Sequence, residues 1–217
     1  MAKSNSLDAD LLVLPGGFLV GHDSESRKRI ADEFIDEARS LDLSVVFGVD
    51  DIIWPIAYGY AWSAVDRMAY CWEERSSTRF WNKMDKQQIK LTDNEWDAKL
   101  KSYDEIRLIT TDGGVAGVLL CGELFNERIQ NALIKLSPHP KIVVDIIHRG
   151  QGFRSAQTMK KLCCNGIASA CSAHALKKCP MKRCYIPGKG DDGNVSPREF
   201  DSIIYVPSRI ELKLFEV

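Results

Sequence analysis

Short apolar runs alternate with amphipathic stretches along most of the chain. Residues 9–14, 44–49 and 142–147 are almost continuously apolar, which is typical of strands covered on both faces. Residues 24–40 carry apolar side chains at helical spacing, and Ser24 or Ser26 can cap this helix. Further helices are predicted over 92–103, 125–136 and 155–165.

Turn signals divide the other apolar runs into strand pairs. An Asp-Gly-Gly sequence separates 107–111 from 115–120, which predicts a β-hairpin. Residues 58–72 are rich in Tyr, Trp, Ala and Val, which favours strand structure in the form of a hairpin. Because strands alternate with helices, the pattern indicates an α/β class with a mixed sheet. Further strands are expected over 166–171, 202–206 and 210–215, with a basic Cys/His-containing loop over 172–200.

The composition fits one globular domain over residues 1–217. Apolar residues make up 45 % of the chain and charged residues 27 %, close to the average for soluble globular proteins. Disordered tails, collagen-like fibres and coiled coils are therefore excluded. No apolar run reaches the roughly 18 residues of a membrane span, and the first residues lack the apolar core of a secretory signal. We expect a cytoplasmic protein without a membrane segment.

Charge is distributed unevenly along the sequence. Residues 146–190 contain nine Lys and Arg but no acidic residue, although the whole chain has 29 basic and 30 acidic residues. A basic block on an acidic body favours a surface for phosphate, carboxylate or nucleic acid. The alternative is a solvated face whose counter-charges lie elsewhere in the fold.

Five of the seven cysteines fall within residues 163–184. Cys171, His174, Cys179 and Cys184 have the spacing of a tetrahedral zinc site, and the intervals resemble those of a nucleic-acid-binding zinc knuckle with two ligand types exchanged. The alternative is a set of reduced thiols beside a basic loop. We favour this alternative, with no metal and no cofactor, and a zinc-supported nucleic-acid-binding module is the outside hypothesis.

A buried strand leads directly into a thiol at Cys121. Gly122 follows it, and then a predicted helix. Ligands of open α/β sheets bind at the carboxyl ends of strands, and a helix N-terminus stabilises a thiolate. Gly122 would admit a substrate and offer its N–H to a developing oxyanion. Cys121 is thus either a reactive thiol or a small buried side chain that fills a gap.

The segment IRLITTDGGVAGVLLCGELFNER, at 106–128, resembles the nucleophile segment of the carbon–nitrogen hydrolase (nitrilase and amidase) superfamily. Weaker similarities follow in the same order as in the family, at 9–21, 44–50, 80–83 and 160–173. The resemblance implies a nitrilase-like α/β sandwich, in which mixed β-sheets are flanked by helices. It also implies a small amide or nitrile as the ligand.

The resemblance implies catalytic roles for three residues. Cys121 would be the nucleophile and Lys83 the group that holds the developing charge, with Lys86 as an alternative to Lys83. Glu95 would be the family's second glutamate, although Thr92 and Glu95 also form a capping-box pattern.

Four further residues are candidates for binding. Gly122 would line the site as an oxyanion donor, and Glu123 would either hold the loop or face solvent. His148 follows an apolar strand, so it either lines the pocket or is a structural His. His22, or Asp23 beside it, would take the place of the family's general base, which this chain lacks.

Two departures from the family pattern qualify the function. Gly16 stands directly after Pro15, where the family has its general-base Glu. The chain also begins late relative to the family domain, so a first strand is lost or is supplied by a partner such as a second copy. We therefore expect a thiol-dependent amide or nitrile hydrolase with weak or lost activity. The alternative is an inactive binding or scaffold protein of the same fold.

Overall fold

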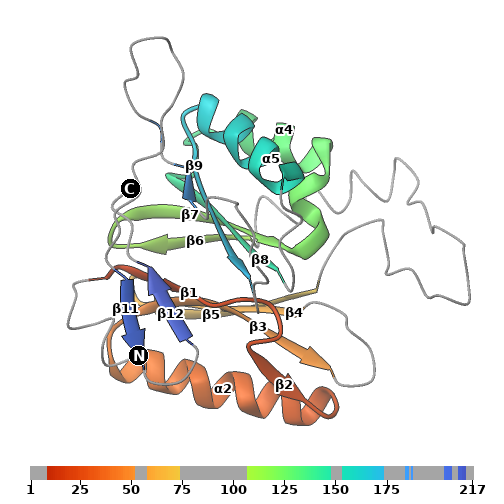
Figure 1. The fold of residues 1–217 in the computed structure, drawn as a ribbon. Helices are drawn as coiled ribbons and strands as arrows, with labels where there is room; N and C mark the ends of the chain where they lie inside the picture. The colour runs from red at the N-terminus through yellow and green to blue at the C-terminus, as the bar shows by residue number, and fades with distance from the viewer. Residues whose placement is uncertain are drawn as a thin grey trace, which may run out of the picture.

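Two β-sheets pack face to face, and helices cover both outer faces (Figure 1). This confirms the expected α/β architecture with mixed sheets between helices. The computed structural model describes residues 9–51, 58–73, 107–147, 153–173, 184–185, 187, 203–206 and 210–213.

The first sheet comes from the N-terminal part of the described chain. Its strands are β1 (Leu11–Val13), β2 (Leu19–Gly21), β3 (Ser44–Asp51), β4 (Tyr58–Ser63) and β5 (Met68–Glu73). Their order is β1-β3-β4-β5, and β2 pairs with the far end of β3. β1 and β2 run parallel to β3, whereas β4 and β5 continue the sheet in antiparallel fashion.

Helix α2 (Ser24–Ser40) covers the outer face of the first sheet and has the predicted bounds. Its N-cap is Asp23 and not one of the two predicted serines. The Asp23 side chain accepts a hydrogen bond from Ser26 N at 2.7 Å, and Ser26 Oγ accepts one from Asp23 N at 3.0 Å. Ser26 thus completes a capping box, which satisfies N–H groups at the helix start.

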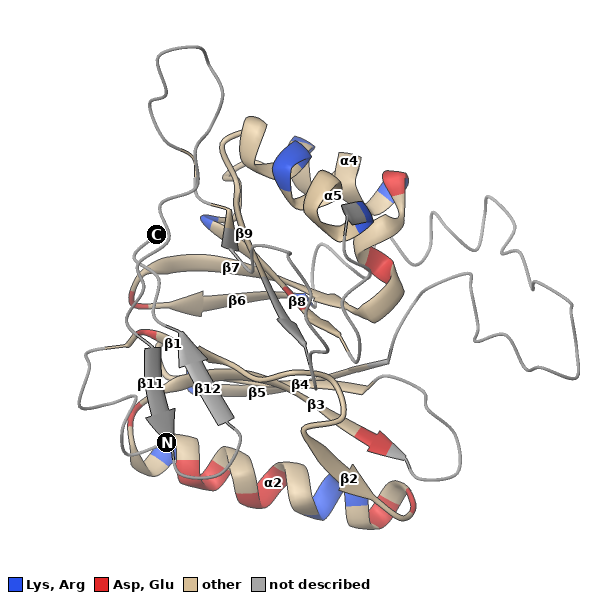
Figure 2. Ribbon diagram, viewed as in Figure 1, with Lys and Arg blue, Asp and Glu red and all other residues tan. Residues whose placement is uncertain are grey.

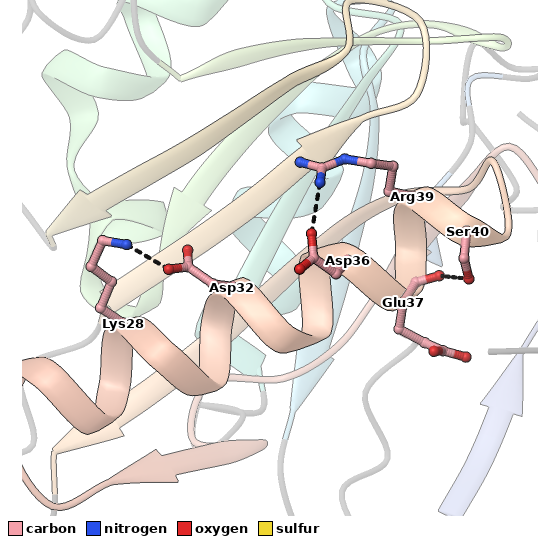
Figure 3. Close-up of polar contacts among 6 residues, drawn as sticks. All are labelled: Lys28, Asp32, Asp36, Glu37, Arg39 and Ser40. Carbon is pink, nitrogen blue, oxygen red and sulfur yellow. Dashed lines mark hydrogen bonds and ion pairs between the residues drawn. The ribbon is translucent and has the colours of Figure 1, made fainter.

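The outward face of α2 is held by contacts between neighbouring turns (Figure 3). Lys28 pairs with Asp32, and Arg39 pairs with Asp36 at 2.6 Å. Such exposed pairs contribute only a few tenths of a kcal/mol each, roughly 0.2–0.5. The stability of α2 therefore depends mainly on its buried stripe, which contains Ala31, Ile35 and Ala38.

The second sheet has the order β10-β9-β8-β7-β6. Its strands are β6 (Leu108–Thr111), β7 (Gly114–Leu120), β8 (Ile142–Ile147), β9 (Ala168–Ala173) and β10 (Cys184–Tyr185). β7, β8 and β9 are parallel, and the two edge strands are antiparallel to their neighbours. The other elements are the 3-10 helix η1 (Cys121–Phe125), α4 (Glu127–Lys135), α5 (Phe153–Cys164) and the hairpin β11 (Ile203–Val206) and β12 (Ile210–Lys213).

The buried core lies in three layers. Val46 and Trp72 of the first sheet meet Val118, Leu120 and Ile146 of the second sheet in the space between the sheets. The opposite face of the first sheet packs under α2. The opposite face of the second sheet packs against η1, α4 and α5. The order of layers is therefore helix, sheet, sheet, helix (Figure 1).

The structure departs from the predicted elements in three places. The sequence pattern misses β2, because three residues are too few to show an alternation. Residues 172–173 continue β9, and 184–185 form β10, although both lie in the segment predicted as a loop. The helix predicted over 125–136 is confirmed as α4, which begins two residues later, but the sequence pattern does not predict the 3-10 helix η1 before it. The helix predicted over 92–103 lies outside the described residues.

The described part of the basic block is an exposed helix surface. Arg154, Lys160 and Lys161 lie on α5, which carries no acidic residue, whereas α2 carries both signs (Figure 2). Lys161 Nζ donates to Gln130 Oε1 at 3.0 Å and links α5 to α4. Within the described chain, no helix is long and apolar enough to cross a membrane.

Gly59 allows the two sheets to approach closely at the end of β7. A Cβ atom at Gly59 would lie 2.4 Å from Cδ2 of Leu120, which is fully buried. Ile146 lies beside the same position, with its Cδ1 atom at 3.4 Å. Since Leu120 is the last residue of β7, the contact fixes how far β7 extends over the first sheet.

We expect Gly59→Ala to lower the free energy of unfolding by about 1–3 kcal/mol, because overpacking forces buried side chains off their rotamers. Leu120→Ala alone should cost about 2–5 kcal/mol through the cavity it leaves. The double variant should cost less than the sum, because the new methyl group fills part of that cavity. Urea unfolding of the four proteins measures this, and strictly additive costs would show that the two positions do not interact.

Candidate active site

Cys121 lies in a sharp turn directly after β7. Its φ angle is 51°, in the left-handed region, which costs a residue with a Cβ atom about 1–2 kcal/mol. The residue is half-buried. Strained residues of this kind cluster at functional sites, and a strained turn after a buried strand presents the nucleophile of α/β-hydrolases. The backbone at Cys121 therefore supports the interpretation of a functional thiol.

A buried ion pair holds the segment that follows Cys121. Arg107 Nη1 donates to Glu123 Oε2 at 2.6 Å. Arg107 is 2 % exposed and Glu123 is fully buried. Hydrogen bonds between charged groups are about twice as strong as neutral ones, and both charges here are removed from water. Arg107 is not predicted as a site residue from the sequence, although a charged residue at the start of an apolar hairpin is a signal for it.

The same ion pair ties both sides of the Cys121 turn together. The carboxylate oxygen Oε2 of Glu123 also accepts a hydrogen bond from Leu120 N at 3.1 Å. On the same strand as Leu120, Val118 N donates to the carbonyl of Arg107 at 2.9 Å. Glu123 thus holds the loop, and the alternative of a solvent-facing Glu123 is wrong. Cys121 is enclosed between two residues that one carboxylate fixes.

Cys121 does not lie at the N-terminus of a long helix. It is the first residue of η1, which has five residues, and α4 begins only at Glu127. Asn126 caps α4, and its side chain accepts hydrogen bonds from Arg128 N and Ile129 N at 3.0 and 3.3 Å. Only the short 3-10 helix η1 follows the thiol directly, so the stabilisation of its thiolate expected from the predicted α-helix is not supported.

The turn that contains Gly16 lies on the inner face of the first sheet. Phe18 N donates to the Pro15 carbonyl at 3.3 Å, and Gly17 has a φ angle of 67°. A Cβ atom on Gly48 of β3 would lie 2.6 Å from Cα of Gly16. Gly48 belongs to the face of β3 that points toward the second sheet, because Val46 on that face packs between the sheets.

Contacts link this turn to the end of β7. Gly48 pairs with Gly59 of β4, and the side chain of Leu120 packs on Gly59. Gly16 is buried and therefore lies between the sheets, toward the end at which β7 leads into Cys121. Gly16, which the family resemblance aligns with a general base, carries no side chain at this position.

His22 lies at the start of α2 and is exposed. Its backbone N–H donates to Ser26 Oγ at 2.8 Å. Asp23, the other proposed substitute for the missing base, is the helix cap. Hydrogen bonds from Ser26 to its carboxylate lower the pKa of Asp23, which makes this group a weaker base.

Three predicted site residues lie outside the described residues, namely Lys83, Glu95 and His148. Gly122 lies beside Cys121 in η1. The convergence of Lys83 with Cys121 stays a prediction. Of the four ligands in the zinc hypothesis, Cys171 and Cys184 lie on the adjacent strands β9 and β10, whereas His174 and Cys179 lie outside the described residues. Among the described residues, no three His, Cys, Asp or Glu side chains gather to hold a metal.

The described cysteines differ in accessibility. Cys71 and Cys164 are exposed and Cys163 is buried. Burial, together with the neighbouring Cys164, raises the pKa of the Cys163 thiol to about 11. Cys163 is therefore a protonated core thiol at neutral pH, which sets it apart from the half-buried Cys121.

Comparison with known proteins reveals relatives in structure but not in sequence. No protein-family model matches the chain. No curated protein matches it. An amidase from Nesterenkonia sp. matches with a TM-score of 0.58 and 12 % identity, over 91 % of this chain and 78 % of its own. A carbon–nitrogen hydrolase from Helicobacter pylori G27 matches with a TM-score of 0.54 and 10 % identity, over 82 % of this chain and 65 % of its own.

A variant of the amidase from Nesterenkonia sp. AN1 also matches, with a TM-score of 0.58 and 12 % identity over 86 % of this chain and 73 % of its own. Another structure of the same enzyme is described as an amidase from the nitrilase superfamily. The chain therefore has the nitrilase-superfamily fold, and the similarity expected from residues 106–128 is confirmed at the level of the fold.

We expect Arg107→Met to lower the free energy of unfolding by about 3–5 kcal/mol, because it leaves the Glu123 carboxylate buried without its counter-charge. The double variant Arg107→Met, Glu123→Gln removes both charges and should recover much of this loss. Urea unfolding gives both values. A loss below 1 kcal/mol in Arg107→Met would contradict a structural role for the pair.

Proposed function

We propose that the chain is a thiol-dependent hydrolase of small amides or nitriles, with Cys121 as its nucleophile. The observation that carries the proposal is the left-handed turn of Cys121 at the end of β7, held by the buried pair of Arg107 and Glu123. Without a use for the thiol, this backbone conformation favours Gly. The fold of amidases supports the reaction class, although a fold by itself does not determine an activity.

The reaction on an amide proceeds in two steps. The thiolate of Cys121 attacks the carbonyl carbon, the C–N bond breaks, and the amine leaves with a proton, which leaves a thioester on the sulfur. Water then attacks the thioester, and the carboxylic acid and the free thiol are formed. Both steps need a group that takes a proton and returns it.

Other residues have proposed roles in the same reaction. Gly122 N–H would donate to the oxyanion of the tetrahedral intermediate. Lys83 would hold the same developing charge, and Glu95 would assist it, as the family resemblance implies. His148 would line the pocket, since it follows β8 in the sequence.

Small amides are the proposed ligands. In a point mutant of the Nesterenkonia amidase, the acetamide moiety of fluoroacetamide adds covalently to the active-site cysteine, and acrylamide undergoes Michael addition there. These two compounds are therefore suitable probes of Cys121, because each reports thiol attack without requiring hydrolysis.

Gly16 favours a second function. Since no carboxylate is present at this buried position, proton transfer lacks the family's usual group, and such catalysis contributes about 10²–10⁴-fold to rates. We therefore expect slow turnover. The alternative is a protein that binds a small amide in the nitrilase fold without hydrolysing it.

We expect Cys121 to react with fluoroacetamide and acrylamide faster than the other six cysteines. Cys163 should label slowly below its pKa of about 11, because its thiol stays protonated. Cys164, the exposed neighbour of Cys163, is the accessible control. Peptide mass mapping over a range of pH measures all rates, and labelling of Cys121 no faster than Cys164 would show that Cys121 is structural.

We expect slow ammonia release from acetamide or propionamide, abolished in Cys121→Ala. Cys164→Ala is the matched control, because this exposed thiol lies outside the site, and it should leave the rate unchanged. An enzymatic ammonia assay with intact-protein mass spectrometry detects both the product and any thioester. Amide binding without ammonia or thioester would favour the binding protein, and equal release by Cys121→Ala would refute the hydrolase.

A further inference from the structure

A thiol that hydrolyses amides needs a proton acceptor near the sulfur. The acceptor must take a proton from the attacking groups and return it to the leaving amine. Gly16 leaves the buried turn beside the site without such a group. The acceptor must therefore come from another strand that reaches the same end of the space between the sheets.

The alternation of side chains along β3 brings Asp50 to the inner face of the first sheet. Val45, Phe47 and Val49 pack under α2 on the outer face. Val46 packs between the sheets, and Gly48 contacts the turn of Gly16 there. Because successive side chains in a strand point to opposite faces, Asp50 shares the face of Val46 and Gly48.

Asp50 lies near the carboxyl end of β3, at the same end of the space between the sheets as the carboxyl end of β7. The arrows of β3 and β6 point in opposite directions in Figure 1, and β7 is antiparallel to β6, so β7 runs in the same direction as β3. Asp50 lies two residues beyond Gly48, and Cys121 lies one residue beyond Leu120. The contact of Gly48, Gly59 and Leu120 therefore precedes both residues along their strands.

The surroundings of Asp50 suit a group that meets both substrate and water. The residue as a whole is half-buried, and its carboxylate oxygen Oδ1 is buried. Its neighbour across the parallel pair is Val20 of β2, which is 46 % exposed. Since paired residues share a face of the sheet, the inner face opens to solvent beside Asp50.

The other described carboxylates near the site are unsuited to proton transfer. Glu123 is bound to Arg107 and to Leu120 N. Asp145 lies in β8 on the same face as Val143 and Ile147, which pack under α4 and α5, away from the space between the sheets. Among the described residues, Asp50 is therefore the acid best placed to serve Cys121.

We infer that Asp50 is the catalytic base of the Cys121 thiol, in place of a carboxylate at Gly16. This rests on the proposed function. Asp50 takes the thiol proton, directly or through one water molecule, and gives it to the nitrogen of the leaving amine as the C–N bond breaks. In the second step, it takes a proton from the water that attacks the thioester and returns it to the sulfur.

A p-nitrophenyl acetate assay separates the two steps. Nitrophenolate leaves without protonation, so acetylation needs only the fraction of Cys121 that is thiolate at the assay pH, whereas attack of water on the acetyl-thioester needs the base. In Asp50→Asn we expect the nitrophenolate burst to persist and the acetyl-enzyme to decay about 10²–10⁴-fold more slowly. Asp66→Asn, in the exposed β4–β5 turn, is the matched control and should decay at the normal rate. Intact-protein mass spectrometry follows the decay, and urea unfolding verifies that each variant is folded.

Asp50→Ala distinguishes a base from a structural residue. Added formate should speed decay of its acetyl-enzyme at least tenfold, because a small carboxylate can occupy the vacated space, and it should not speed decay in Asp50→Asn. Normal decay in Asp50→Asn, or no effect of formate on Asp50→Ala, would overturn the role of Asp50 and leave Cys121 as nucleophile. If no burst depends on Cys121, the proposed function fails, and the role of Asp50 fails with it.

Discussion

The ion pair of Arg107 and Glu123 is the interaction on which the local structure around Cys121 depends. A residue with a left-handed backbone tends to relax unless its flanking residues are fixed, and here both flanks are fixed by one carboxylate and its guanidinium partner. Burial makes the pair costly to form and more costly to break. The sharp turn thus persists because its loss would leave a charge without a partner inside the protein.

The glycines between the sheets have the complementary role of bringing backbone segments together. At Gly48 and Gly59 a methyl group would collide with the turn of Gly16 and with Leu120, respectively. These contacts align the N-terminal turn, the middle of the first sheet and the end of β7. The position of the site is therefore determined by close backbone packing, and the conformation of its thiol is determined by charge.

The sequence predicts the elements whose signals are local. The bounds of α2 follow from its apolar stripe, and β8 follows from its continuous apolar run. β2 and β10 are missed because they are short and exist only through pairing with β3 and β9. For the site, the strand, thiol and glycine around Cys121 can be found in the sequence. Arg107 and Asp50 cannot be identified from the sequence alone. Their positions depend on the register of the β6–β7 hairpin and on which face of β3 points inward, and both are set by tertiary pairing.

The backbone at Cys121 has a consequence for how such a protein changes over time. Glycine would adopt the same φ angle without a Cβ penalty, so replacement of this cysteine by glycine would remove the strain of the turn. Only a benefit from the sulfur opposes that replacement. In relatives that no longer use the thiol, we therefore expect glycine to replace cysteine at this position early, before the residues of the surrounding sheets change.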